Sequence, residues 1–249
     1  MHPLLAEFLG TAILILIGNG VVANVVLQRT KGHDSGWIVI TAGWAMAVFV
    51  GVLCSAAASG AHLNPAVTLG LAMTGQFGWE SVPGYMLAQV GGGAVGGALV
   101  FAVYRDHYAV TNDADAKLAT FCTGPAIRSP SSNLITEVLG TFILVLAVLL
   151  TVGPTITLTA MSGGEMQGVV GLQTIGALPV AFVVLAIGLG LGGTTGYAIN
   201  PARDLGPRLA HAILPIPGKR DSDWGYAPIP VIGPFVGGAL AALMHTYFC

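Results

Sequence analysis

The stretch "SGAHLNPAVT" (residues 59–68) places an asparagine and a proline inside a long apolar region, and "GYAINPARDL" (residues 196–205) repeats its central tripeptide. Asparagine is a strong N-cap, and proline suits the first position of a helix, where no backbone N–H is needed. Asn64-Pro65-Ala66 and Asn200-Pro201-Ala202 therefore predict the starts of two helices, each preceded by a short non-helical segment.

The helices that these tripeptides open are too short to cross a bilayer. Their apolar character extends over about 65–75 and 201–213. A helix of about 12 residues rises about 18 Å, whereas the hydrocarbon core is about 30 Å thick. Irregular backbone at membrane depth is tolerated only where protein buries it or where it lines a watery cavity. One tripeptide alone would be explained as an ordinary helix cap, but two favour a pair of re-entrant half-helices.

The rest of the chain has the composition of a membrane protein. Of its 249 residues, 54% are hydrophobic and only 8% are charged, whereas soluble domains carry about 25% charged residues. The net charge of −2 and the absence of a basic run give no reason to expect a nucleic-acid partner. The Gly-rich stretch 153–176 is neither clearly a span nor clearly a loop. The predicted membrane spans are 4–27, 37–57, 83–104, 134–153, 177–195 and 229–248.

The two halves of the chain repeat each other. "AEFLGTAILIL" (6–16) matches "TEVLGTFILVL" (136–146) at seven of eleven positions. Each half then contains two spans, a half-helix and a third span, so the second half must enter the membrane from the opposite side. We predict one transmembrane domain (1–249), in which an inverted repeat over about 1–104 and 134–249 is joined by a loop over about 105–133.

Two half-helices that enter from opposite faces meet with their N-termini near the midplane. Their macrodipoles place partial positive charge there. The carboxamides of Asn64 and Asn200 offer N–H donors, and the backbone carbonyls of the preceding segments, at His62, Leu63 and Ala198, offer acceptors. Such a path favours neutral hydroxyl compounds and opposes cations.

With six spans, two Asn-Pro-Ala tripeptides and a duplicated first helix, nearly the whole chain resembles the aquaporin superfamily, whose half-helix dipoles are a known cation barrier. The resemblance implies an all-α membrane protein of six transmembrane helices and two re-entrant half-helices. It also implies that each monomer has its own pore and that four monomers assemble. Glu7 and Glu137 occupy equivalent places in two apolar helices, and the resemblance makes them structural braces that accept hydrogen bonds from the two tripeptide loops.

The resemblance places four residues at an outer constriction: Trp44, Gly188, Tyr197 and Arg203. By this resemblance, water channels of the family have Phe, His, a small residue and Arg at these positions, in that order. Glycerol facilitators have Trp, Gly, Phe and Arg. This chain matches the glycerol facilitators at three of these positions and has tyrosine where they have Phe. Tyrosine there stays within the glycerol branch, and Asp204 after "NPAR" is a further mark of it. A glycine at 188 widens the ring and makes room for Tyr197. We expect Trp44 and Tyr197 to form an apolar corner and Arg203 to donate hydrogen bonds from the opposite side.

Simpler explanations stay open for several of these residues. Trp44 also fits an interfacial aromatic belt, and Gly188 also fits close helix packing. Asp204 and Arg208 also form an i,i+4 pair that supports a helix. His62 fits either a pore-lining or a loop-bracing role, and no neighbouring ligand suggests a metal site.

The sequence predicts a passive channel for glycerol and related small neutral polyols, with some water permeability; the alternative is a water-selective channel. An active transporter would need an intramembrane ionisable pair for coupling, and Glu7 and Glu137 are already explained as braces. No Ser-His-Asp, paired-carboxylate or metal-ligand arrangement supports an enzyme, so no cofactor is expected.

The expected partners are the lipid bilayer, the transported solutes, water and three further copies in a homotetramer. The resemblance implies a multi-pass protein of the cell (plasma or inner) membrane with both termini in the cytoplasm. That orientation places every Lys and Arg on or near outside loops, which opposes the positive-inside rule. These residues are Arg29, Lys31, Arg105, Lys117, Arg128, Arg203, Arg208, Lys219 and Arg220.

Overall fold

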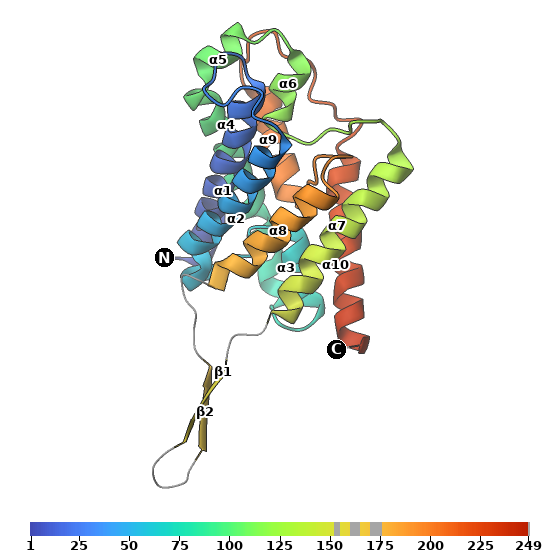
Figure 1. The fold of residues 1–249 in the computed structure, drawn as a ribbon. Coiled ribbons are helices and arrows are strands. Elements are labelled where there is room, and N and C mark those ends of the chain that lie inside the picture. The colour runs from blue at the N-terminus through green and yellow to red at the C-terminus, as the bar shows by residue number, and fades with distance from the viewer. Residues whose placement is uncertain (152–154, 160–164, 170–175, 249) are drawn as a thin grey trace.

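The computed structural model describes residues 1–151, 155–159, 165–169 and 176–248. The helices stand side by side as one bundle, with α5 and α6 at one end and the C-terminus at the other (Figure 1). The long helices are α1 (Pro3–Val26), α2 (Trp37–Ser59), α4 (Val82–Val103), α7 (Pro130–Leu150) and α10 (Pro228–Phe248). The shorter elements are α3 (Pro65–Met73), η1 (Trp79–Ser81), α5 (Arg105–Val110), α6 (Ala114–Ala119), β1 (Thr155–Thr159), β2 (Glu165–Val169), α8 (Leu178–Gly190) and α9 (Pro201–Ile213).

Five of the six predicted spans form helices that are long and apolar enough to cross a membrane. The sixth, predicted over 177–195, is the shorter helix α8, with 13 residues. It ends at Gly190, before the turn that contains Gly192 and Gly193, because a glycine-rich run does not sustain a helix. Residues 170–175 before it lie outside the described part of the chain.

Both predicted half-helices are present, and their starts are those that the tripeptides indicate. Asn64 is the N-cap of α3, and its side-chain oxygen accepts a hydrogen bond from the Ala66 N–H at 2.9 Å. Asn200 caps α9 in the same way, accepting from the N–H groups of Ala202 and Arg203. A proline occupies the first position of each helix, so the sequence prediction is confirmed.

Each half-helix packs against the last long helix of the other half. Helix α9 lies against α4, and α3 lies against α10. Two glycines permit this approach: a Cβ at Gly93 would lie 2.7 Å from the Ala202 carbonyl oxygen, and one at Gly238 would lie 2.8 Å from that of Ala66. The first turn of each half-helix therefore lies directly against a glycine of that long helix.

Two segments contain structure that the sequence did not predict. The 105–133 loop includes the short helices α5 and α6, and α6 is capped by Asp113, whose carboxylate accepts from the N–H groups of Asp115 and Ala116. A six-residue helix is too short to give a periodic pattern. Within 153–176, which the sequence left unassigned, β1 and β2 pair antiparallel, with Thr155 opposite Val169. The all-α class holds for the bundle, to which this hairpin is an addition.

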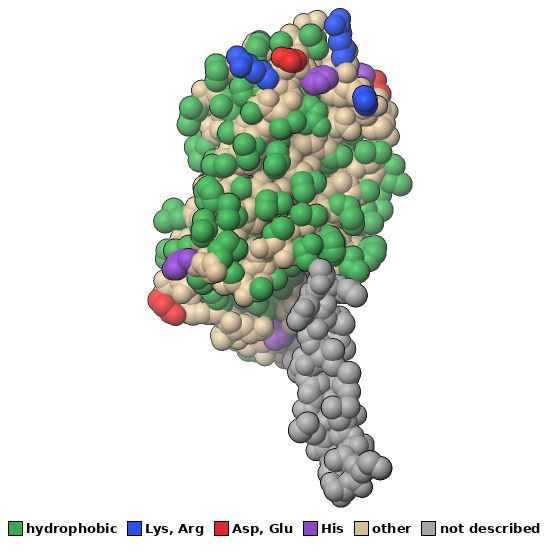
Figure 2. Space-filling view, turned by 90° about the vertical axis from the view of Figure 1, so that its left-hand side faces the viewer, with side chains coloured by type: hydrophobic (Ala, Val, Ile, Leu, Met, Phe, Trp, Pro, Cys, Tyr) green, Lys and Arg blue, Asp and Glu red, His purple; other side chains and the backbone are tan. Residues whose placement is uncertain are grey.

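The surface of the bundle agrees with a membrane environment. Hydrophobic side chains cover a broad band of the face seen in Figure 2, and its Lys and Arg side chains gather at the end that carries α5 and α6. Large apolar side chains such as Leu87 (75% exposed) and Val103 (69% exposed) point outward from α4. Exposure on this scale is unfavourable in water and suits lipid.

Candidate functional site

Two cavities meet inside the bundle. The inner one has a volume of about 260 Å³ and is lined by both tripeptide asparagines and by the segments before them. The outer one has a volume of about 280 Å³ and is lined by residues of the 119–126 segment. Trp44, Tyr197 and Arg203 line both cavities, so these three side chains lie at the junction. The sequence had grouped the same three residues in one ring.

The guanidinium of Arg203 lies over the indole ring of Trp44. The distance from Arg203 Cζ to the ring centroid is 4.0 Å, which is a cation–π contact. The sequence placed Arg203 across the ring from Trp44, and the structure instead stacks the two. The guanidinium therefore presents its donors from a position fixed by an apolar surface.

Gly188 is the fourth residue of the predicted ring. The Tyr197 ring occupies the space that a side chain at this position would need. A Cβ at Gly188 would lie 2.8 Å from Tyr197 Cζ and 3.0 Å from Thr41 Cγ2. Trp37 completes this corner: its indole N–H donates to the Gly188 carbonyl at 3.0 Å, and its ring meets the Tyr197 ring edge-on at 5.9 Å. Sequence reasoning missed Trp37, because a tryptophan at the start of a span is equally typical of an interfacial anchor.

The two tripeptide loops exchange hydrogen bonds at the centre of the bundle. Asn64 Nδ2 donates to the Ile199 carbonyl at 2.8 Å, and Asn200 Nδ2 donates to the Leu63 carbonyl at 2.8 Å. The sequence had assigned these amides to a passing solute and the Leu63 carbonyl to the pore lining. Each amide has two hydrogens, so this exchange uses one and leaves the other for a further acceptor, and both asparagines line the inner cavity.

Two buried glutamates accept hydrogen bonds from the backbone of the two tripeptide loops. Glu7 accepts hydrogen bonds from the N–H groups of His62 (3.0 Å) and Leu63 (2.7 Å). Glu137 accepts from those of Ala198 (3.0 Å) and Ile199 (2.9 Å). A hydroxyl adds one further bond in each half, at 2.6 Å from Ser59 Oγ to Glu7 and at 2.7 Å from Thr195 Oγ1 to Glu137. The two carboxylates thus bind the two loops in the same way.

The backbone of these loops is strained at equivalent places. Ala61 and Leu63 have φ values of 54° and 49°, and Tyr197 and Ile199 have values of 37° and 44°. The left-handed region costs a non-glycine residue of order 1–3 kcal/mol. No feature of the sequence predicts this strain, because none of these residues is a glycine or an asparagine. Hydrogen bonds to the glutamates offset this cost, since they use the N–H groups of the strained segments.

His62 makes contacts that fit both roles left open by the sequence, pore lining and loop bracing. It lines the inner cavity, and its Nδ1 lies 3.1 Å from the hydroxyl of Thr68 in α3. Its ring also contacts those of Phe77 and Tyr85. Among the residues that the structure describes, no group of three or more His, Cys, Asp or Glu side chains is arranged to hold a metal ion.

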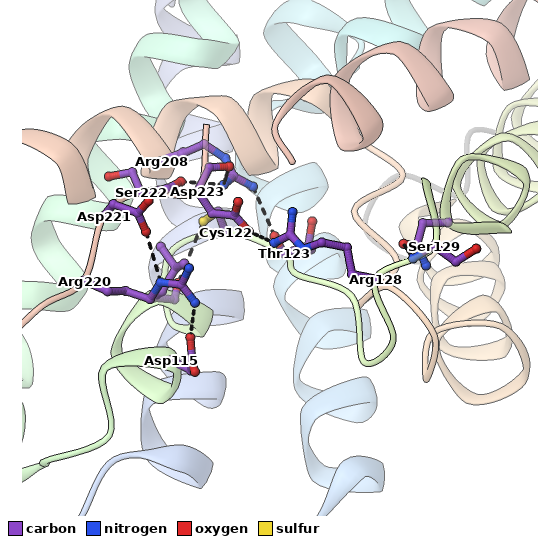
Figure 3. A network of polar contacts seen from close by, with 12 residues as sticks. Asp115, Cys122, Thr123, Arg128, Ser129, Arg208, Arg220, Asp221, Ser222 and Asp223 are labelled. Atoms are coloured by element: carbon purple, nitrogen blue, oxygen red, sulfur yellow. Dashed lines mark hydrogen bonds and ion pairs between the residues drawn. The ribbon is translucent and has the colours of Figure 1, made fainter. Parts of the chain in front are cut away.

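Asp204 and Arg208 do more than support their helix. Their ion pair (Nε to Oδ1, 2.8 Å) is fully buried. Asp204 Oδ2 also accepts from the N–H (2.8 Å) and the hydroxyl (2.7 Å) of Thr123, and Arg208 Nη1 donates to the Ser222 carbonyl at 2.6 Å. The pair therefore joins α9 to the 119–126 segment, which lines the outer cavity, and to the segment that contains Ser222 (Figure 3).

A second link, at the surface, joins α6 to the segment that contains Ser222. Arg220 contacts the carboxylates of Asp115 and Asp221 (Figure 3). The hydrogen bonds that Arg220 donates to Asp115 and then to Asp221 raise the pKa of Arg220 above its ordinary value. This exposed link is therefore charged throughout the physiological range, although screening by solvent keeps its contribution small.

Comparison with known proteins places these features in a family. Residues 1–245 match the family model described as Major intrinsic protein. The chain is 55% identical over 247 residues to the probable glycerol uptake facilitator protein of Thermotoga maritima, with 99% of each chain covered. It is 53% identical over 248 residues to the glycerol uptake facilitator protein of Streptococcus pneumoniae, with 100% of each covered. Among solved structures, the aquaglyceroporin from Plasmodium falciparum matches with a TM-score of 0.82 and 31% identity, covering 99% of this chain and 95% of that one.

Proposed function

Because this chain belongs to the major intrinsic protein family, we propose that its two cavities are parts of one passive pore for glycerol and related small neutral polyols, with some water permeability. It is a multi-pass membrane channel and not an enzyme. Its relatives in Thermotoga maritima and Streptococcus pneumoniae carry the name of glycerol uptake facilitators, which supports this solute class.

The observation that carries the proposal is the junction between the cavities. Trp44 and Tyr197 offer apolar surface to a carbon backbone, and Arg203 offers N–H donors to hydroxyl groups on the same side. Gly188 adds neither bulk nor a competing donor. Apolar walls with a few placed polar groups are the usual design of a small-molecule site. A polyol matches such a surface better than water does.

The chemistry of the selectivity filter follows from these contacts. Arg203 stays charged and repels cations, as do the N-termini of α3 and α9 at the inner cavity. Asn64 and Asn200 supply one amide hydrogen each to solutes in single file. Glu7 and Glu137 act as structural braces that keep both loops in their strained conformations.

Stopped-flow light scattering on proteoliposomes tests the proposal. Vesicles shrink in a hyperosmotic impermeant solute, and in glycerol they shrink and then reswell when glycerol enters. We expect reswelling several times faster than in protein-free vesicles. Rapid water efflux without reswelling in glycerol would instead establish the water-selective alternative.

We further propose that residues 1–249 form one channel domain built of two inverted repeats and that four copies assemble, each with its own pore. The assembly lies in the cell (plasma or inner) membrane with both termini in the cytoplasm. The lipid-facing character of the exposed apolar side chains supports the membrane location.

A further inference from the structure

Asn19 is a buried polar residue of α1, outside the four positions of the proposed selectivity filter. Its side chain makes two hydrogen bonds: Nδ2 donates to the Phe121 carbonyl at 2.9 Å, and Oδ1 accepts from Arg203 Nη1 at 3.4 Å. Asn19 has 0% of its surface exposed. It therefore links the filter arginine to the segment that covers the outer cavity.

The chemistry of the two partners requires a side chain with both a donor and an acceptor. A carbonyl oxygen only accepts and a guanidinium only donates. The same argument fixes the orientation of the amide, since its NH₂ group must face Phe121 and its oxygen must face Arg203. A leucine of similar size makes neither bond, and an aspartate keeps only the bond to Arg203.

Gly18, the residue before Asn19, makes room for Trp44, the ring on which Arg203 stacks. A Cβ at Gly18 would lie 2.3 Å from Trp44 Cζ3, so the indole lies directly against α1 at this glycine. Arg203 in turn lies over that indole at 4.0 Å. Gly18 therefore admits the tryptophan, while Asn19 holds the guanidinium that stacks on it.

The third group in this arrangement is the 119–126 segment. Phe121 is fully buried, and the residues after it, Cys122 to Ala126, line the outer cavity. Thr123 is bound to Asp204, which directly follows Arg203 in α9. Asn19 and Asp204 thus hold this segment at two points on either side of Cys122.

We propose that Asn19 is a positioning residue of the selectivity filter: it fixes Arg203 against Trp44 and, through the Phe121 carbonyl, sets the width of the passage from the outer cavity. Without it, the guanidinium loses a buried acceptor and turns into the passage to be solvated. The inference rests on the proposed function, because the consequence is a change in the preference for polyol over water.

The test is the ratio of glycerol to water permeability in proteoliposomes that contain Asn19→Leu. We expect the ratio to fall by at least about threefold, which is the lower range for the loss of one hydrogen bond of ordinary strength, because the larger solute is more sensitive to narrowing. Asn19→Asp keeps the acceptor for Arg203 and is expected to retain most of the original ratio. A purely structural role would lower both permeabilities together.

Thr11→Val is the matched control. Thr11 lies in the same helix, is equally buried, and its hydroxyl has no hydrogen-bond partner among the described residues. Both permeabilities are expected to stay unchanged in this variant. If Asn19→Leu fails to assemble, the smaller Asn19→Ser, which also cannot reach both partners, replaces it with the same expected fall.

Two outcomes overturn the inference: an unchanged ratio in Asn19→Leu, or an equal fall of the ratio in Asn19→Leu and Asn19→Asp. Failure of the proposed function has a different signature, which is the absence of glycerol flux in the unsubstituted protein. In that case water permeability decides, and a value for Asn19→Leu equal to that of Thr11→Val overturns the positioning role.

Discussion

At the scale of single residues, the absence of a side chain at Gly188 is as important as the side chains around it. The space that a Cβ would occupy is taken by the Tyr197 ring. Close helix packing and a widened filter are therefore compatible explanations of Gly188. The Tyr197 ring that packs against this glycine also lines both cavities.

Gly188→His tests this role. The new side chain must displace Tyr197 and adds a donor, so we expect glycerol permeability to fall by about tenfold while water permeability changes by less than about threefold. Stopped-flow measurements of both solutes provide the comparison. Gly190→His is the control, because a Cβ at Gly190 of the same helix meets no atom within 4 Å. Equal loss of both permeabilities in Gly188→His would count against the filter assignment.

The residue scale also shows where the sequence was insufficient. Asn64 and Asn200 were identifiable because an N-cap followed by proline is a local signal. The stacking of Arg203 on Trp44 was not, because it depends on Gly18 and Asn19 of a different helix. Contacts of this kind arise from tertiary packing, and a single sequence carries no local signal for them.

At the scale of elements, the tripeptide loops are held by carboxylates that lie in other helices. Glu137 of α7 accepts three hydrogen bonds from the loop before α9, and the residue is 1% exposed. Within the described part of the chain, Glu137 is thus the acceptor for the N–H groups of both Ala198 and Ile199. The conformation of the loop is thus a property of the contact between α7 and the loop.

Glu137→Ala should therefore destabilise the loop before α9. It leaves the N–H groups of Ala198 and Ile199 buried without an acceptor, at a cost of about 1–3 kcal/mol each. We expect a lower thermal unfolding midpoint and a parallel fall in glycerol and water permeability. Glu80→Ala, which removes an exposed carboxylate, is expected to change neither. Normal folding and flux in Glu137→Ala would remove the brace assignment.

The elements themselves were predictable where apolar runs were long. The five long helices and both half-helices follow the predicted ranges to within a few residues, because composition and caps are local properties. Helices α5 and α6 were not predictable, since six residues are too few for a periodic pattern. The shorter extent of α8 was missed because the apolar run continues through Leu191 while the glycines after it end the helix.

At the scale of the whole molecule, the charges and the family resemblance give opposite orientations. Lys and Arg side chains gather at the end that carries α5 and α6 in the face shown (Figure 2). Several of them are engaged in local contacts: Arg208 with Asp204, Lys117 with the Pro217 carbonyl, and Arg128 with Asp223. The positive-inside rule depends on Lys and Arg, and neighbouring acidic groups contribute little to it, so these contacts leave the conflict in place.

From the family resemblance, we expect the α5–α6 end to lie outside. A protease site inserted after the exposed Asn112 should be cleaved in intact cells, whereas a site added after the C-terminus should be cleaved only after lysis. The reverse pattern would establish the orientation that the positive-inside rule favours. Passive flux runs in both directions, so either result is compatible with the proposed channel.

The exchange of hydrogen bonds between Asn64, Ile199, Asn200 and Leu63 has a consequence for biosynthesis. A ribosome delivers the first repeat to the membrane while the second does not yet exist. At that stage the Leu63 carbonyl and the Asn64 amide lack their partners. The first half-helix therefore reaches its final position only when the second arrives, and pore formation is a late step that joins both halves of the nascent chain at once.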